Sequence, residues 1–282
     1  LGAELINGRG ELLRFGGQVM KNVAGYDVSR ALAGSMGQLG LITEVSLKVL
    51  PVPPAQSSFV VRMKQAAALD QLQRWAGLPL PLNASSWAPV SLGSDRAPDG
   101  SGVASGEPTD DGYLIVRLRG ALAAVQAAIP VMHSHLSTTG HSAIPLDEVQ
   151  AHSWWERCRD HTDAFFTQAP APDQALWRLS LPPTAPALAL PSDTLVEWHG
   201  AQRWCWAPAS AALALRALAH EHGGHATLWR PSQAHPQVDR EVGVFSPLSP
   251  VQHRLQRALQ AQFDPQGVFD TGRLGLDRAP QE

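Results

Sequence analysis

The sequence predicts an α+β fold built on an antiparallel sheet. Strand-like and helix-like segments follow one another between residues 55 and 245, with hairpins joining some of them. The composition supports a packed core, since 44% of the 282 residues are hydrophobic and 17% are charged. A chain of this length has room for two domains or one large one.

The charge and cysteine content argue against several classes of partner. The formal net charge is -3 and the Lys and Arg residues are scattered singly, so neither nucleic acid nor an anionic bilayer is an expected partner. Cys158 and Cys205 stand alone, which indicates reduced thiols and neither a disulfide framework nor a zinc or iron–sulfur motif. The apolar runs are shorter than the roughly 20 residues that cross a bilayer. We therefore expect a cytoplasmic protein without direct membrane insertion.

Residues 1–50 are glycine-rich and predict strands joined by loops. Residues 3–6 and 11–15 flank Asn7-Gly-Arg-Gly10, whose residue types suit a hairpin turn. Between Leu41 and Val49, apolar residues alternate with more polar ones, as in a strand with one wetter face. Pro51, Pro53 and Pro54 then end the strand, and a domain boundary is predicted there.

The middle of the chain, residues 51–245, is predicted to form the α+β domain. Strands are predicted at residues 57–63, 112–118, 175–181, 194–199 and 203–206, and helices at residues 65–75, 122–136, 146–166 and 209–222. Residues 93–111 are rich in Gly, Ser, Asp and Pro and predict a surface loop.

Residues 246–282 predict one further helix and an extended segment after it. Ser249-Pro-Val-Gln252 has the residue types of a capping box with Pro at the first helical position. The apolar stripe of this helix consists of Val251, Leu255, Ala258, Leu259 and Phe263. The helix is expected to end at Asp264-Pro265.

A glycine-dense segment before the strand at Leu41 is the strongest candidate for ligand binding. Gly34, Gly37 and Gly40 allow the backbone to approach a ligand closely, and exposed amides in such a loop can cradle phosphate or ring acceptors. These glycines precede a strand, whereas the dinucleotide fingerprint follows a strand and opens a helix. A Rossmann domain is therefore not predicted. Taken alone, such a loop is more often a tight connection than a binding site.

Three segments together resemble the FAD-linked oxidase family, also called the vanillyl-alcohol-oxidase or PCMH type. They are Lys-Asn-Val-Ala-Gly-Tyr-Asp at residues 21–27, Gly-Ser-Met-Gly-Gln-Leu-Gly-Leu-Ile-Thr-Glu at residues 34–44, and Lys-Val-Leu-Pro at residues 48–51. Within that family, residues 15–30 are similar to the E-subunit family of bacterial glycolate oxidases. The resemblance is strong over residues 1–53, weaker at residues 195–204, 223–227 and 263–274, and thin between them.

The resemblance implies an FAD-dependent oxidoreductase subunit that takes part in the oxidation of glycolate to glyoxylate with electron transfer through flavin. Residues 1–50 would be part of a PCMH-type FAD-binding domain that lacks its N-terminal half, residues 51–245 a cap domain, and residues 246–282 a helix with a return segment to the FAD domain. The implied partners are a second flavin subunit of D type and an iron–sulfur subunit of F type. The complex would give the protein a peripheral place at the inner membrane.

The resemblance also implies which residues contact FAD, through the main chain for the most part. Asn22, Val23 and Gly25 would lie near the flavin, Gly34, Ser35 and Gly37 along the phosphates and ribose, and Gly40 and Ile42 beside the adenine. Asp270 stands where the family often has Asn, and an ionised carboxylate only accepts hydrogen bonds. The catalytic residues stay unassigned.

Other readings of the sequence remain open. The chain could serve as a structural subunit without redox turnover, or as part of a stand-alone FAD-dependent dehydrogenase of another 2-hydroxy acid. A metal site at His220, His222 and His225 is disfavoured, because these residues span a helix end, a glycine pair and the next strand. Nine tryptophans predict a packed core, with a subunit interface as the alternative.

Overall fold

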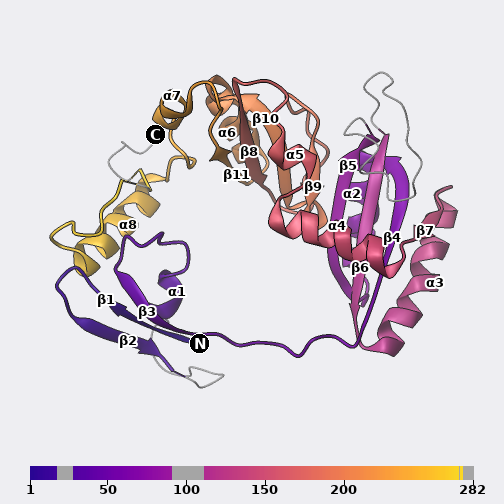
Figure 1. The fold of residues 1–282 in the computed structure, drawn as a ribbon, viewed down its shortest axis with the longest axis horizontal. Helices are drawn as coiled ribbons and strands as arrows, with labels where there is room; N and C mark the ends of the chain where they lie inside the picture. The colour runs from indigo at the N-terminus through magenta and orange to yellow at the C-terminus, as the bar shows by residue number, and fades with distance from the viewer. Residues whose placement is uncertain (18–27, 91–110, 273, 276–282) are drawn as a thin grey trace. The chain divides into compact units, whose positions relative to one another are not determined.

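The computed structural model describes residues 1–17, 28–90, 111–272 and 274–275. The chain divides into two compact units, which are described separately (Figure 1). The first unit joins Leu1–Pro51 with Val244–Glu282, and the second unit is Val52–Gly243. No helix among the described residues is both long enough and apolar enough to cross a membrane.

The first unit contains a three-stranded antiparallel sheet in the order β2–β1–β3. Strand β1 (Gly2–Ile6) pairs with β2 (Leu12–Gly16) on one side and with β3 (Leu41–Ser46) on the other. The side-chain oxygen of Asn7 accepts hydrogen bonds from the backbone nitrogens of Arg9 and Glu11, each at 2.9 Å. This Asx geometry closes the turn, and the predicted hairpin is confirmed.

Strand β3 differs from the prediction in length and in burial. It ends at Ser46, three residues before Val49, the predicted end of the strand. Leu41, Ile42 and Val45 are 58%, 41% and 52% exposed, so neither face of β3 is buried among the described residues. The alternation of apolar residues therefore predicted the strand correctly. Its second implication, that only one face of the strand is exposed to water, is wrong.

The C-terminal helix belongs to the first unit, and its last residue contacts the β1–β2 hairpin. Helix α8 (Pro250–Phe263) starts with the predicted capping box, in which Ser249 Oγ accepts from Gln252 N at 3.3 Å and Gln252 Oε1 accepts from Ser249 N at 3.1 Å. The ring of Phe263 lies 6.0 Å from that of Phe15, and Phe263 O accepts from Gly8 N at 2.8 Å. The rest of the predicted stripe, Val251, Leu255, Ala258 and Leu259, is exposed.

The second unit is built on an eight-stranded antiparallel sheet in the order β11–β8–β10–β9–β5–β6–β4–β7. The strands are β4 (Ala55–Lys64), β5 (Leu82–Pro89), β6 (Asp111–Gly120), β7 (Ala143–Pro145), β8 (Gln174–Ser180), β9 (Leu195–Glu197), β10 (Gln202–Pro208) and β11 (His225–Arg230). This sheet confirms the predicted α+β class. Strands β5 and β7 were not predicted, and the predicted loop at residues 93–111 lies outside the described residues except for Asp111.

Helices cover both faces of this sheet (Figure 1). They are α2 (Gln65–Ala76), α3 (Leu122–Thr138), α4 (Glu148–Asp160), α5 (Ala164–Thr167), α6 (Ala212–Glu221) and α7 (Pro236–Glu241), and the first unit adds the short α1 (Val28–Ala31). Phe59 and Val61 of β4 enter the cluster that contains residues of α2 and α3, whereas Val60 packs with Trp154 of α4. Because successive side chains of a strand point to opposite faces, α2 and α3 lie on one face and α4 on the other.

The single helix predicted at residues 146–166 is wrong. Helix α4 ends because His161 adopts a left-handed conformation with φ 52°. Helix α5 then starts at Ala164, after its N-cap Asp163, whose side chain accepts from Phe165 N at 3.0 Å. The His161 ring stacks on that of Phe166 with 4.1 Å between centroids. The helix predicted at residues 209–222 begins with a 3-10 turn, Ala209–Ala211, and the strand predicted at residues 194–199 ends at Glu197 in another, Trp198–Gly200.

Most of the tryptophans pack in the core of the second unit. Those with 5% exposure or less are Trp75, Trp87, Trp154, Trp177, Trp204 and Trp206. The packed-core prediction is confirmed for these residues. Trp198 and Trp229 are 70% and 41% exposed and therefore need another explanation.

The short strand β9 and the turn after it join the two halves of the eight-stranded sheet. Trp198, His199 and Gly200 have φ values of 53°, 55° and 94°, so the chain reverses through a left-handed turn. A Cβ on Gly200 would lie 2.8 Å from Leu69 Cδ2 of α2. Arg203, fully buried, donates from Nε to Gly200 O at 3.3 Å and from Nη2 to Ala185 O at 2.6 Å. Burial lowers the pKa of Arg203 to about 10, so its guanidinium stays charged at neutral pH.

We expect Gly200→Ala to lower the free energy of unfolding by about 2–4 kcal/mol, because the new Cβ is strained at positive φ and meets Leu69. Chemical denaturation measures this change. Gly77→Ala is the matched control, since Gly77 has φ -79° and its Cβ would lie 3.7 Å from Arg74 O. The control should change the free energy by less than about 1 kcal/mol. Equal losses in both variants would contradict the role given to the turn.

Candidate functional site

Three of the predicted cofactor residues, Gly34, Ser35 and Gly37, lie in one loop between α1 and β3. Leu32 and Leu39, at the two ends of this loop, are buried in the core of the first unit. Two consecutive turns shape the loop: Ser35 N donates to Leu32 O at 3.2 Å, and Gln38 N donates to Ser35 O at 3.0 Å. The loop is therefore anchored at both ends, and the glycines between its ends are exposed.

Backbone conformation favours glycine at positions 34 and 37. Gly34 and Gly37 have φ values of 82° and 81°, and Met36 between them also has a positive φ of 51°. A Cβ built on either glycine would meet nothing within 4 Å. The space beside both glycines is thus open within the described chain, which leaves room for a ligand to approach the backbone.

Gly40 has a different reason to be glycine. Its φ is 146°, and a Cβ there would lie 2.5 Å from Ile6 O and 2.6 Å from Leu5 Cδ1. Close packing against β1 is therefore enough to explain why residue 40 is a glycine, and no ligand is needed for that explanation. Ile42 follows in β3 and is 41% exposed. The remaining predicted residues, Asn22, Val23 and Gly25, lie outside the described part of the chain.

Gln38 is a candidate site residue that the sequence did not reveal. Its side chain is 1% exposed, and both Nε2 and Oε1 are buried without a hydrogen-bond partner among the described residues. A buried amide without partners costs free energy, so Gln38 is suited to donate to and accept from a bound group. Together with the open space beside Gly34 and Gly37, this orphaned amide fits a flat, phosphate-bearing cofactor. Only its place between Gly37 and Leu39 could have drawn attention to it in the sequence.

The segment after α8 is held by local hydrogen bonds. The carboxylate of Asp264 accepts from Val268 N at 2.8 Å and from Phe269 N at 2.7 Å. Asp270 Oδ1 accepts from Gly272 N at 3.1 Å. The carboxylate of Asp270 therefore closes a turn within its own segment.

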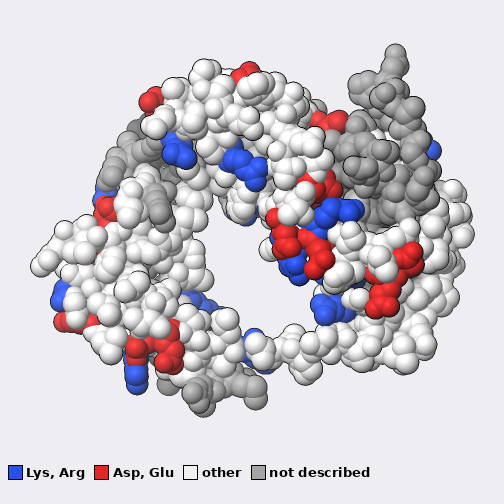
Figure 2. All heavy atoms as spheres, viewed as in Figure 1, with Lys and Arg blue, Asp and Glu red and all other residues white. Residues whose placement is uncertain are grey.

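The described residues contain no group of three or more His, Cys, Asp and Glu side chains that could hold a metal ion. On the face seen in Figure 2, Lys and Arg side chains are interspersed with Asp and Glu side chains. Ion pairs such as Arg62 with Asp111, at 3.4 Å, and Arg159 with Asp160, at 2.7 Å, join some of them at the surface.

The chain has the PCMH-type fold, which it shares with solved structures. Two solved structures share it at 12–13% sequence identity, a level that speaks for the fold alone. The chain matches p-cresol methylhydroxylase with a TM-score of 0.58, covering 99% of this chain and 65% of that one. It matches alkyldihydroxyacetonephosphate synthase with a TM-score of 0.58, covering 96% of this chain and 52% of that one.

The sequence comparisons identify similar proteins. The chain is 35% identical over 274 residues to glycolate oxidase subunit GlcE of Escherichia coli (strain K12), which covers 97% of this chain. It is also 35% identical over 71 residues to glycolate oxidase subunit GlcD of Bacillus subtilis (strain 168), and 40% identical over 52 residues to D-lactate dehydrogenase of Anaerostipes hadrus. These matches cover 25% and 18% of this chain and 15% and 11% of the two relatives. No protein-family model matches the chain.

The chain is thus a relative of the glycolate oxidase subunit GlcE, and the predicted resemblance is confirmed. It spans 64% of the length of that relative.

Gln38→Leu should leave the free energy of unfolding of the flavin-free protein unchanged or raise it by up to about 1 kcal/mol, because it removes two buried polar atoms that have no partners. Asn7→Leu is the contrasting variant in the same unit. Asn7 is 4% exposed, donates to Glu11 Oε2 at 2.7 Å and accepts two backbone hydrogen bonds, so its loss should cost about 2–4 kcal/mol. Thermal unfolding compares the two, and a large loss for Gln38→Leu would mean that Gln38 has partners in the free protein.

Proposed function

We propose that the chain is part of an FAD-binding subunit of a glycolate oxidase complex, which takes part in the oxidation of glycolate to glyoxylate. The observation that carries this proposal is the 35% identity to GlcE along 97% of the chain. Because the chain spans 64% of GlcE, the proposal concerns the activity of the whole subunit, to which this chain contributes. When bound, FAD would supply the redox chemistry, and the residues of the subunit would hold and orient it.

The proposed FAD contacts lie mainly in the first unit. Asn22, Val23 and Gly25 would contact the flavin, Gly34, Ser35 and Gly37 the phosphates and ribose, and Gly40 and Ile42 the adenine. The anchored loop, the open space beside Gly34 and Gly37 and the orphaned amide of Gln38 support this assignment. In this proposal residues 1–50 and 246–282 serve the FAD-binding domain, and residues 51–245 form the cap.

The proposed partners are a second flavin subunit of D type and an iron–sulfur subunit of F type. The local match to GlcD of Bacillus subtilis supports a relationship in sequence between this chain and a D-type subunit. The complex would work in the cytoplasm and reach the inner membrane peripherally. Glycolate would be its substrate.

A second candidate function is a stand-alone FAD-dependent dehydrogenase of another 2-hydroxy acid. The match over 52 residues to a D-lactate dehydrogenase favours it, since lactate is a 2-hydroxy acid. Turnover of a 2-hydroxy acid by the purified whole subunit alone would select this function, and turnover only in the presence of the partner subunits would select the complex.

Gly37→Asn should abolish or strongly reduce FAD binding and leave the fold intact. Asn tolerates positive φ, and its side chain would fill the open space beside Gly37. Gly10→Asn is the matched control, because Gly10 lies in the same unit with φ 78° and equally open space. The flavin content per chain, read from visible absorption, is compared for both variants in the 282-residue chain and in the complete gene product. Equal flavin contents in the two variants would contradict the proposed site.

A further inference from the structure

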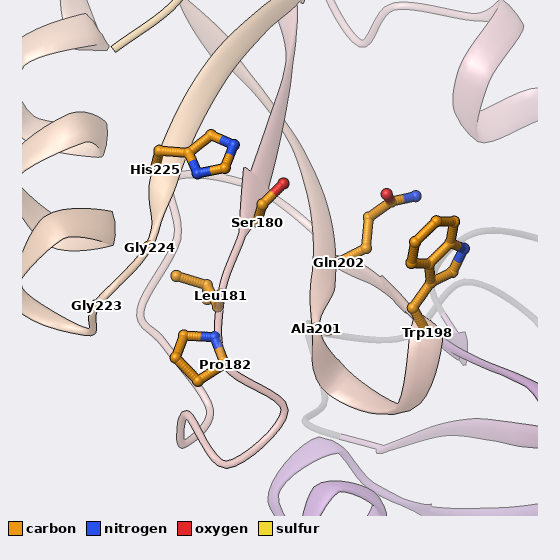
Figure 3. Close-up of a pocket in the computed structure, with 9 residues that line it drawn as sticks. All are labelled: Ser180, Leu181, Pro182, Trp198, Ala201, Gln202, Gly223, Gly224 and His225. Carbon is orange, nitrogen blue, oxygen red and sulfur yellow. The ribbon is translucent and has the colours of Figure 1, made fainter. Parts of the chain in front are cut away.

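A hollow against β4, β6 and β7 of the second unit, called here the β7 hollow, has a charged side chain in its wall. Its volume is about 300 Å³, and its lining includes Val60, Arg62, Tyr113, His141, Ser142 and Ile144. A hollow at the end of β8, β10 and β11, shown in Figure 3, differs in this respect, because none of the residues that line it is a Lys, Arg, Asp or Glu. The β7 hollow is therefore the better candidate for a charged ligand.

The register of the sheet explains how an apolar and a polar wall meet in the β7 hollow. Val60 of β4 pairs with Ile144 of β7, and Arg62 of β4 pairs with Tyr113 of β6. Side chains two residues apart on a strand share a face, so Val60 and Arg62 lie on the same face of the sheet. An apolar row thus lies directly beside the row that contains the guanidinium. Residues 140–142, which lead into β7, complete the polar part of the lining.

Contacts within the unit hold these walls in place. Val60 and Tyr113 are 1% and 5% exposed and pack with Trp154 of α4. On the polar side, His141 Nδ1 lies 3.1 Å from Thr139 Oγ1, and this hydrogen bond fixes the imidazole ring. A hollow that is already formed needs little ordering when a ligand binds, which favours affinity for a small molecule.

Arg62 has donor capacity to spare. Among the described residues, its ion pair is with Asp111, whose Oδ2 lies 3.4 Å from Arg62 Nη2. The two side chains are 57% and 37% exposed, and an exposed pair at that distance is weak. A guanidinium carries five N–H donors, so donors remain for a second carboxylate.

The other groups of the β7 hollow define the rest of the ligand. Ile144 is 47% exposed beside the buried Val60, which leaves apolar surface that an aliphatic group could cover. The hydroxyl of Ser142 offers a further donor next to the guanidinium. The carboxylate of Asp111 reduces the net positive charge at Arg62, so a monoanion fits this wall better than a dianion such as a phosphate ester.

We propose that the β7 hollow binds a small aliphatic monocarboxylate. The Arg62 guanidinium and the Ser142 hydroxyl donate to the carboxylate, and the aliphatic group lies against Val60 and Ile144. This site requires neither flavin nor the loop at residues 34–37, so it stands independently of the proposed function.

The experiment is an NMR titration of the 282-residue chain with sodium butyrate at low ionic strength, in which the methyl signal of butyrate reports binding. Arg62→Gln should weaken binding at least about tenfold, because the charge-assisted hydrogen bonds are lost. Arg74→Gln, at an exposed position of α2, is the matched control and should bind like the unmodified chain. Asp111→Asn should tighten binding severalfold, because it removes the negative charge that competes for Arg62.

A second set of measurements tests the apolar wall with the cation preserved. Ile144→Ser should weaken the binding of butyrate severalfold and change that of acetate little, because acetate has only a methyl group to place there. Butyramide, which is uncharged, should bind at least about tenfold more weakly than butyrate.

Unfolding curves identify any loss of binding that comes from misfolding. The proposed site is overturned if the unmodified chain does not bind butyrate, if folded Arg62→Gln binds it equally well, if Asp111→Asn weakens binding, or if butyramide binds as tightly. Gly37→Asn should bind butyrate normally, so a failure of the flavin assignment is distinguishable from a failure of this site.

Discussion

The eight-stranded sheet of the second unit depends on the pairing of β9, a strand of three residues, with β5 and β10. Only Ser86 with Glu197 and Trp87 with Val196 pair across the joint to β5. The buried carboxylate of Glu197 strengthens the other side, because it accepts from Trp204 Nε1 at 2.8 Å and from Gln202 Nε2 at 3.1 Å. The left-handed turn that follows places Trp198 at a hollow that Ser180, Gln202 and His225 also line. The same constraint therefore joins the sheet and shapes one wall of that hollow.

The first unit, in contrast, holds an exposed stretch of backbone in a fixed shape. Leu32 and Leu39 anchor the ends of the glycine loop in the core, and Gly34 and Gly37 between them adopt conformations that most side chains would strain. This arrangement suits the binding of a ligand by main-chain amides. In such a site the residue type matters because it decides which backbone conformations are allowed. Gly40, in contrast, is fixed by its contact with β1. Neighbouring glycines of one motif thus have separate physical reasons to be glycine.

Local signals allowed a correct prediction wherever one short segment determines the structure. The hairpin around Asn7 and the capping box at Ser249 are examples, because their residues bond to near neighbours in the sequence. Strand β5 was missed because its buried Ser85 and Ser86 look like loop residues. The helix break at His161 was missed because His161 adopts a left-handed conformation although it is not a glycine. Its ring stacks on that of Phe166, a tertiary contact that the sequence does not mark. The row formed by His225, Ser180 and Gln202 arises from strand register, which brings together residues far apart in the sequence, and no motif reveals it.

The most direct test of the proposed function is the visible absorption spectrum of the complete subunit, purified with its partner subunits and recorded without oxygen before and after glycolate is added. Our account predicts the absorption of bound FAD in this subunit, its bleaching by glycolate in the complex, and the appearance of glyoxylate. A complete, folded subunit without flavin, in a complex that still oxidises glycolate, would contradict the account and would support a purely structural role.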